Sequence, residues 1–175
     1  SWNVSNVTNM FYMFNRAYSF NQDIRLWNVS NVTKMSSMFA EAASFNNKNS
    51  DNYTWEWDVS NVIDMQAMFY YTNVFNGDIS TWNVSNVTNM DQMFEAALLF
   101  NQSINTQQVT VNGNKYTAWD VSNVKFMVGM FKNAETFDQN INGWNVSNVI
   151  NMSSMLRDTP FNQDISGWDV SSVTD

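Results

Sequence analysis

The chain has 175 residues, a hydrophobic fraction of 44% and a formal net charge of −8. This composition excludes a disordered chain. Lys and Arg residues are scattered singly, so we expect neither nucleic acid nor an anionic membrane surface as a partner. Cys and His are absent, which excludes disulfides, Cys/His zinc sites and any Cys or His nucleophile or base. Without a run of 18 apolar residues, the sequence predicts no membrane span.

One sequence unit recurs along the chain and reads W-[ND]-V-S-N-V-x-x-M-x-x-M-F-x-x-A-x-x-F-N-Q-D-I-x-x, with small departures. Its seven copies begin at Trp2, Trp27, Trp57, Trp82, Trp119, Trp144 and Trp168, in steps of 25, 30, 25, 37, 25 and 24 residues. Strict recurrence at this period predicts one solenoid domain over residues 1–175, in which equivalent side chains stack in columns. Because the chain begins and stops inside a unit, we interpret it as a piece of a longer protein.

Each unit divides into two halves. The first half, as in residues 79–84, alternates apolar and polar side chains around the Trp, which is typical of a half-buried strand. A Ser-Asn pair follows and favours a turn. The second half, as in residues 35–45, places two Met, two Phe and one Ala at helical spacing. We therefore predict an α/β repeat solenoid with one short parallel strand and one short helix or helical turn per unit, and with the Trp and Met columns buried.

Two inserts, at residues 47–56 and 105–118, lengthen the two long steps. Asn112 and Gly113 lie between two alternating segments and predict a β-hairpin over 107–117 with a type I′ turn. Both inserts precede a Trp segment, so we expect them on the same side of the domain. Inserts on one face often mark a binding surface, although they could instead only pack on each other. The candidate binding residues, aromatic side chains and one charge, are Tyr53, Trp55, Lys115 and Tyr116.

A second candidate surface lies beside the Trp and Val columns. If these columns point inward, the alternating neighbours point outward. The outward residues that could bind a ligand are Asn3, Asn28, Asp58, Asn83, Asp120 and Asn145, together with Ser30, Ser60, Ser85 and Ser122. Such amides and hydroxyls could bind sugar hydroxyls or a partner's backbone. Alternatively, these side chains only form the hydrogen bonds of the local turn and bind no ligand. The next Asn column, which includes Asn31 and Asn86, is expected to tie successive coils together.

The repeat motif W-[ND]-V-S-N-V-x-x-M-x-x-M-F-x-x-A-x-x-F-N-Q-D-I resembles the repeat of BspA-like bacterial surface proteins and lipoproteins. The string from Ile79 to Met90 also resembles the leucine-rich-repeat consensus, with Trp and Met in place of Leu. This resemblance covers the chain except for the two inserts. It implies a leucine-rich-repeat-like solenoid, a secreted or surface-anchored parent protein and a role in adhesion. It implies no catalytic residues.

These observations predict a non-catalytic recognition or adhesion scaffold that binds a protein partner at a cell surface through the strand face and the inserts. One alternative is a carbohydrate-binding module that uses Tyr53, Trp55 and Tyr116 as stacking aromatics. Another is a spacer or fibre segment without a ligand of its own. The sequence predicts no cofactor and no metal, since it has no EF-hand or nonapeptide calcium spacing. Its carboxylates also lack the context of a hydrolase site.

Overall fold

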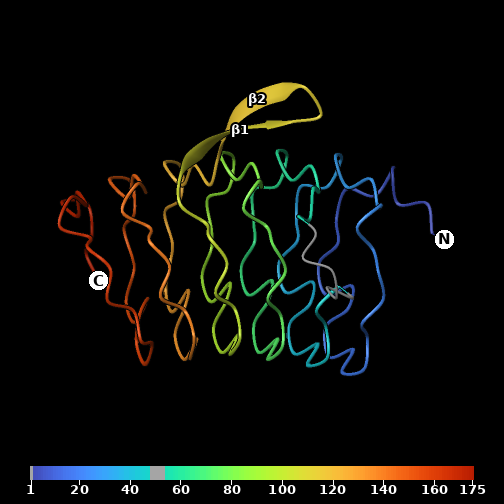
Figure 1. Ribbon diagram of the computed structural model, residues 1–175, viewed down its shortest axis with the longest axis horizontal. Helices are drawn as coiled ribbons and strands as arrows, with labels where there is room; N and C mark the ends of the chain where they lie inside the picture. The colour runs from blue at the N-terminus through green and yellow to red at the C-terminus, as the bar shows by residue number, and fades with distance from the viewer. Residues whose placement is uncertain (1, 48–53) are drawn as a thin grey trace.

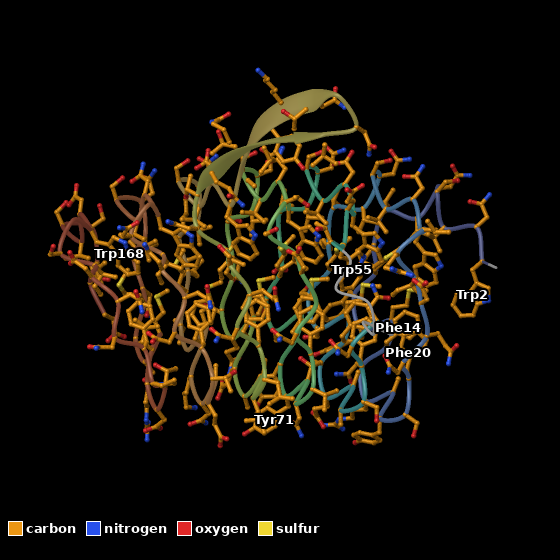
Figure 2. The ribbon with its side chains drawn as sticks, viewed as in Figure 1. Trp2, Phe14, Phe20, Trp55, Tyr71 and Trp168 are labelled. Carbon is orange, nitrogen blue, oxygen red and sulfur yellow. The ribbon has the colours of Figure 1, made fainter. Side chains whose placement is uncertain are left out.

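The computed structural model describes residues 2–47 and 54–175, which wind into a row of stacked coils that follow the sequence units (Figure 1). The two termini lie at opposite ends of the row. The hairpin formed by β1 (Gln107–Val111) and β2 (Asn114–Ala118) stands on one edge, which we call the hairpin edge. On the opposite edge lie the outward side chains of the Met-Phe halves, such as Tyr71 (Figure 2). We call it the turn edge.

The predicted α/β architecture of parallel strands and helices in a leucine-rich-repeat-like solenoid is wrong. The described part of the chain has no helix, and hence none that could cross a membrane. Its two strands, β1 and β2, pair antiparallel. Parallel pairing is limited to isolated bridges, which lie directly before the first Met of a unit instead of at the Trp. These bridges join Asn9, Lys34, Asp64, Asn89, Phe126 and Asn151 in succession, with one further bridge between Thr54 and Asp78.

The Trp-Val halves do not form strands because their backbone N–H groups bond within their own coil. The Trp82 N–H donates to the Ile79 carbonyl (3.1 Å), and the Val87 N–H donates to the Val84 carbonyl (2.9 Å). Side chains provide most of the links between coils instead, although the Trp119 N–H does donate to the Trp82 carbonyl at 3.0 Å. The Asn86 amide donates to the Ser60 carbonyl of the preceding coil at 2.7 Å. The same link is made by Asn31, Asn61, Asn123 and Asn148, each at 2.8 Å. The predicted Asn ladder is therefore confirmed.

The Met-Phe halves do not form helices because each contains two residues with left-handed backbone angles. In the third unit these are Ala67 and Tyr71, with φ of 52° and 54°, and such angles interrupt a right-handed helix. The Ala67 N–H donates to the Asp91 carbonyl of the next coil (2.8 Å), whereas the following Met68 N–H donates back to Met65 (3.2 Å). Successive N–H groups alternate between these two kinds of bond, so the segment is a series of β-turns.

The core is built of columns of equivalent side chains, as the repeat predicts. Phe39, Phe69, Phe94 and Phe131 stack with ring centroids 5.5 to 5.7 Å apart. In the central units the Trp and both Met are buried. Trp2, at the N-terminal end of the row, is 65% exposed (Figure 2).

The predicted hairpin is confirmed in its position and in its turn. Val111 pairs with Asn114 across the turn. Asn112 and Gly113 between them have φ of 50° and 81°. Positive φ at both central residues defines the type I′ turn, whose twist matches that of the two strands. The hairpin therefore forms from local sequence signals, without support from a larger sheet.

Candidate binding site under the hairpin

The hairpin is tied to the coil that precedes it in the row. The hydroxyl of Tyr116 on β2 donates to the Thr81 carbonyl at 2.6 Å. The side-chain amide of Gln107 on β1 donates to the Ser80 carbonyl at 3.3 Å. Val109 and Tyr116 also pack, partly buried, against the core. The hairpin consequently lies over neighbouring coils instead of extending freely into solvent (Figure 1).

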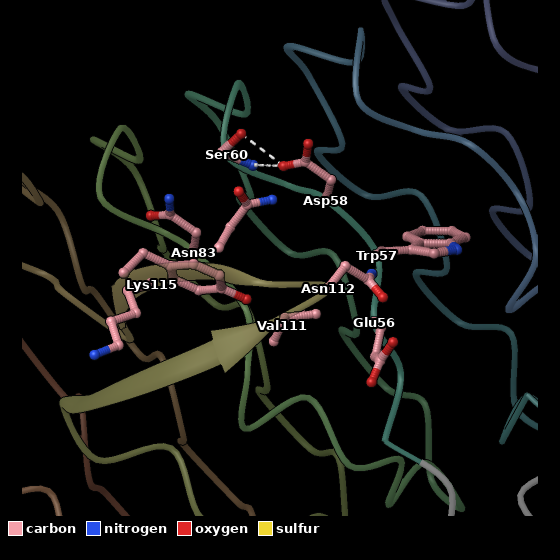
Figure 3. A pocket seen from close by; sticks show the side chains of 10 residues that line it. Glu56, Trp57, Asp58, Ser60, Asn83, Val111, Asn112 and Lys115 are labelled. Carbon is pink, nitrogen blue, oxygen red and sulfur yellow. Dashed lines mark hydrogen bonds between the residues drawn. The ribbon is translucent and has the colours of Figure 1, made fainter.

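A pocket of about 330 Å³ lies between the hairpin and the coils below it (Figure 3). The coils contribute Glu56, Trp57, Asp58, Ser60 and Asn83, and the hairpin contributes Val111, Asn112, Asn114, Lys115 and Tyr116. The lining thus joins residues from the end of the first insert, from two coil units and from the second insert. The two inserts, distant in the sequence, meet at this one pocket.

Charged groups stand on different sides of the pocket. In Figure 3, Lys115 lies across the pocket from Glu56 and Asp58. Asp58 accepts hydrogen bonds from the backbone N–H of Ser60 (3.1 Å) and from its hydroxyl (2.6 Å). Within residues 2–47 and 54–175, none of the three charged side chains forms an ion pair. The pocket therefore offers two carboxylates and one ammonium group to a ligand.

The phenol of Tyr116 is held in its protonated form. Its partial burial raises the pKa above the ordinary value for tyrosine, and the nearby charges of Asp58 and Glu56 raise the pKa further. The protonated hydroxyl is the donor to the Thr81 carbonyl. The same hydrogen bond fixes the position of the ring, so Tyr116 forms a rigid wall of the pocket.

Five of the residues predicted from the sequence to bind a ligand meet at this pocket: Asp58, Asn83, Ser60, Lys115 and Tyr116. The others lie along the coil face outside its lining: Asn3, Asn28, Asp120, Asn145, Ser30, Ser85 and Ser122. Tyr53 lies outside the described residues. The prediction did not include Glu56, Asn112 or Asn114, although their position within the two inserts was a usable signal.

The regular Asn/Asp-Ser face serves the local turns. In every unit the Asn or Asp side-chain oxygen accepts the backbone N–H of the Ser two residues later, as Asn83 does from Ser85 at 3.2 Å. Such bonds are the usual reason for Asn and Asp at turns. This geometry favours the structural interpretation of the face wherever no insert covers it.

The prediction that Trp55 is a surface aromatic for stacking is wrong. Trp55 is 1% exposed and lies inside the row of coils (Figure 2). Its ring meets Trp57 edge-on at 4.4 Å and Trp82 at 5.4 Å, and its carbonyl accepts the indole N–H of Trp82 at 2.7 Å. Residues two apart in an extended segment share a face, so Trp55 follows Trp57 into the core.

Fold and site together define a tandem-repeat protein with an insert-bearing edge. Among the residues that the structure describes, no group of three or more acidic side chains could hold a metal ion.

The chain belongs to the family described as "Mycoplasma protein of unknown function, DUF285", whose sequence model matches residues 1–56, 47–115 and 106–175. These tandem matches support the repeat organisation, and they overlap within the two inserts. No curated protein and no solved structure matches the chain.

Proposed function

We propose that this chain is a non-catalytic recognition module that binds a segment of a protein partner in the pocket under the hairpin. The observation that carries the proposal is the attachment of the hairpin through Tyr116 and Gln107, which brings both inserts to one pocket. The coils beneath provide a rigid, well-packed base. A ligand there would therefore meet preorganised groups and would not have to order a loop on binding.

The charges of the pocket suit a polypeptide. Glu56 and Asp58 can pair with a Lys or Arg side chain of the partner, and Lys115 can pair with a carboxylate or a backbone carbonyl on the other side. The ring of Tyr116 and the side chain of Val111 add apolar surface. An aromatic anchor beside charged groups is the usual composition of an interface hot spot.

We infer a cell-surface or secreted parent protein with a role in adhesion, because the repeat motif resembles that of BspA-like bacterial surface proteins. The carbohydrate alternative at this pocket is less well supported. It relied on three stacking aromatics, and one of them, Trp55, is buried in the core. The spacer alternative assigns no role to the pocket.

Removal of the hairpin tests the proposal. Deleting Gln107–Ala118 restores the 25-residue step between Trp82 and Trp119 and the Ile-x-x-Trp spacing of the other units. Peptides would be selected from a random peptide display library on the intact chain, and their affinities compared on both proteins. We expect peptides that contain Lys or Arg and that bind the intact chain at least tenfold more tightly than the deletion variant. Failure to enrich any such peptide would contradict the proposal.

A paired point variant separates pocket chemistry from hairpin folding. Glu56→Gln and Asp58→Asn together keep the shape of the pocket and remove both carboxylates. The selected peptides should bind this variant more weakly, with a reduced dependence on salt concentration. Asn145→Ala, on the coil face outside the pocket, is the matched control and should leave binding unchanged.

A further inference from the structure

A second hollow, of about 410 Å³, is lined by residues of the Met-Phe halves and therefore belongs to the turn edge. Its lining includes Tyr12 of the first coil, Ser37 and Ala40 of the second, Gln66 and Tyr70 of the third, and Gln92 of the fourth. Tyr71, next to Tyr70, marks this edge in Figure 2. None of these residues belongs to the site under the hairpin.

The hollow lies where small outward side chains of the second and third coils, Ser37, Ala40 and Ala67, separate two tyrosines that occupy different positions of the repeat unit. Tyr12 and Tyr70 come from the first and third coils, and the second coil between them carries Ser37 and Ala40 at the corresponding positions. With roughly 4.8 Å between paired segments, the two tyrosines are about 10 Å apart along the row. They are also three positions apart within the unit, so they stand at diagonal corners of the hollow. The small residues of the second coil form the floor of the groove between them.

Each aromatic wall is braced by a neighbouring ring. The Phe11 and Tyr12 rings lie 3.9 Å apart, and the Tyr70 and Tyr71 rings lie 4.5 Å apart. Tyr12 is nevertheless 53% exposed, whereas Tyr70 is half-buried beneath Tyr71, which lies outside the lining. Exposed aromatic rings that are already held in place can bind a ligand at a small cost in side-chain entropy.

The charges of the groove are balanced. Arg16 and Glu41, both in the lining, form an ion pair at 3.2 Å. Beside the groove, Lys132 pairs with Glu95 at 2.7 Å, and Glu95 also accepts a hydrogen bond from Gln92 at 2.7 Å. Among the residues that the structure describes, the lining therefore presents no unpaired charge to a charged ligand.

The remaining polar groups are neutral hydrogen-bonding groups. Among the described residues, no protein group bonds to the Ser37 hydroxyl or to the side-chain amide of Gln66, while the backbone N–H groups of both are satisfied. Hydroxyl and amide groups both donate and accept hydrogen bonds. That property matches the hydroxyl groups of a sugar, which also donate and accept.

We propose that this groove binds a neutral oligosaccharide. The C–H face of a sugar ring packs on Tyr12 or Tyr70, and its hydroxyls bond to Ser37, Gln66 and Gln92. This site is independent of the proposed peptide site, because the two lie on opposite edges of the row.

Calorimetry with soluble hexasaccharides tests this assignment. The probes are neutral hexasaccharides of glucose, galactose, mannose and N-acetylglucosamine, compared with a sialylated hexasaccharide. We expect at least one neutral probe to bind the intact chain, with affinity lowered at least about tenfold by Tyr12→Ala and by Tyr70→Ala. The sialylated probe should bind more weakly.

Controls separate this site from the rest of the molecule. Phe126→Ala removes an exposed aromatic ring outside the groove lining and should leave binding unchanged, as should deletion of Gln107–Ala118. Thermal unfolding shows whether the Tyr70→Ala variant still folds. If it does not, Gln66→Ala at an exposed position of the lining provides a second variant in which the affinity for the neutral probe should fall. The assignment is overturned if no neutral probe binds, if only the sialylated probe binds, or if the groove variants bind as the intact chain does.

Discussion

The two halves of each repeat unit hold neighbouring coils together by different means. In the Trp-Val half, side chains make most of these links. The Asn86 amide reaches the Ser60 carbonyl at 2.7 Å, and the Trp82 indole reaches a carbonyl of the adjoining insert. In the Met-Phe half, the backbone itself makes the links, as between the Ala67 N–H and the Asp91 carbonyl at 2.8 Å.

This difference explains where the chain can vary without losing its fold. A link made by a side chain requires that residue in every unit, which accounts for the regular Trp and Asn columns. A backbone link requires no particular side chain, so outward positions of the Met-Phe half are free. At one such position the successive units carry Tyr12, Ser37, Ala67 and Gln92. The proposed groove on the turn edge depends on that freedom.

The largest expected effect concerns the inward residues of the Met-Phe half, which are not free to vary. Met68→Ala in a central coil should lower the free energy of unfolding by about 2–5 kcal/mol, because the stacked columns cannot close around the cavity. Ser85→Ala, whose hydroxyl bonds to Asn83 at a partly exposed position, should cost less than about 1 kcal/mol. Chemical denaturation measures both. Equal losses of unfolding free energy would mean that the Ser column contributes as much to stability as the buried Met column.

The next effect compares the two kinds of link directly. Asn86→Ala removes the bond to the Ser60 carbonyl and should cost about 1 kcal/mol. Gln66→Ala is its counterpart in the Met-Phe half, where the coil-to-coil bonds are backbone bonds, and should change stability by less than about 0.5 kcal/mol. Equal destabilisation of the two variants in urea would contradict the conclusion that side chains link the coils in one half and the backbone links them in the other.

The smallest effect concerns the left-handed residues of the Met-Phe half. Each Met-Phe half has two such residues. The first is Gly129 in the fifth unit, with φ of 57°, and Ala67 in the third unit, with φ of 52°. Ala67→Gly should therefore raise the free energy of unfolding by about 0.5–1 kcal/mol, since relief of the left-handed strain exceeds the added entropy of the unfolded chain. Ala43→Gly, where φ is not positive, should be destabilising by a similar amount. A melting temperature that falls in both variants would contradict the claim that the left-handed conformation of Ala67 is strained.

Much of the organisation could be predicted from the sequence because it depends on recurrence or on local chemistry. The step between Trp residues locates the units and the two inserts. The inward columns follow from their repetition in every unit, and the Asn ladder follows from the position of one amide per coil. Asn112 and Gly113 specify the hairpin turn because few residue pairs adopt two positive φ angles.

The sequence did not determine the secondary structure of each unit or the position of the pocket, because both depend on which acceptor each N–H or O–H donor reaches. Apolar spacings of three and four suit a helix, but they suit a series of β-turns equally well, and only the neighbouring coil, by accepting every second N–H, selects the turns. The same holds for the Trp-Val half, where local turns take the N–H groups that strands would need. The pocket depends on the direction in which the hairpin folds, which the Tyr116 bond to the Thr81 carbonyl decides. Local sequence signals do not encode an acceptor that lies 35 residues away, so the tertiary structure alone placed these groups together.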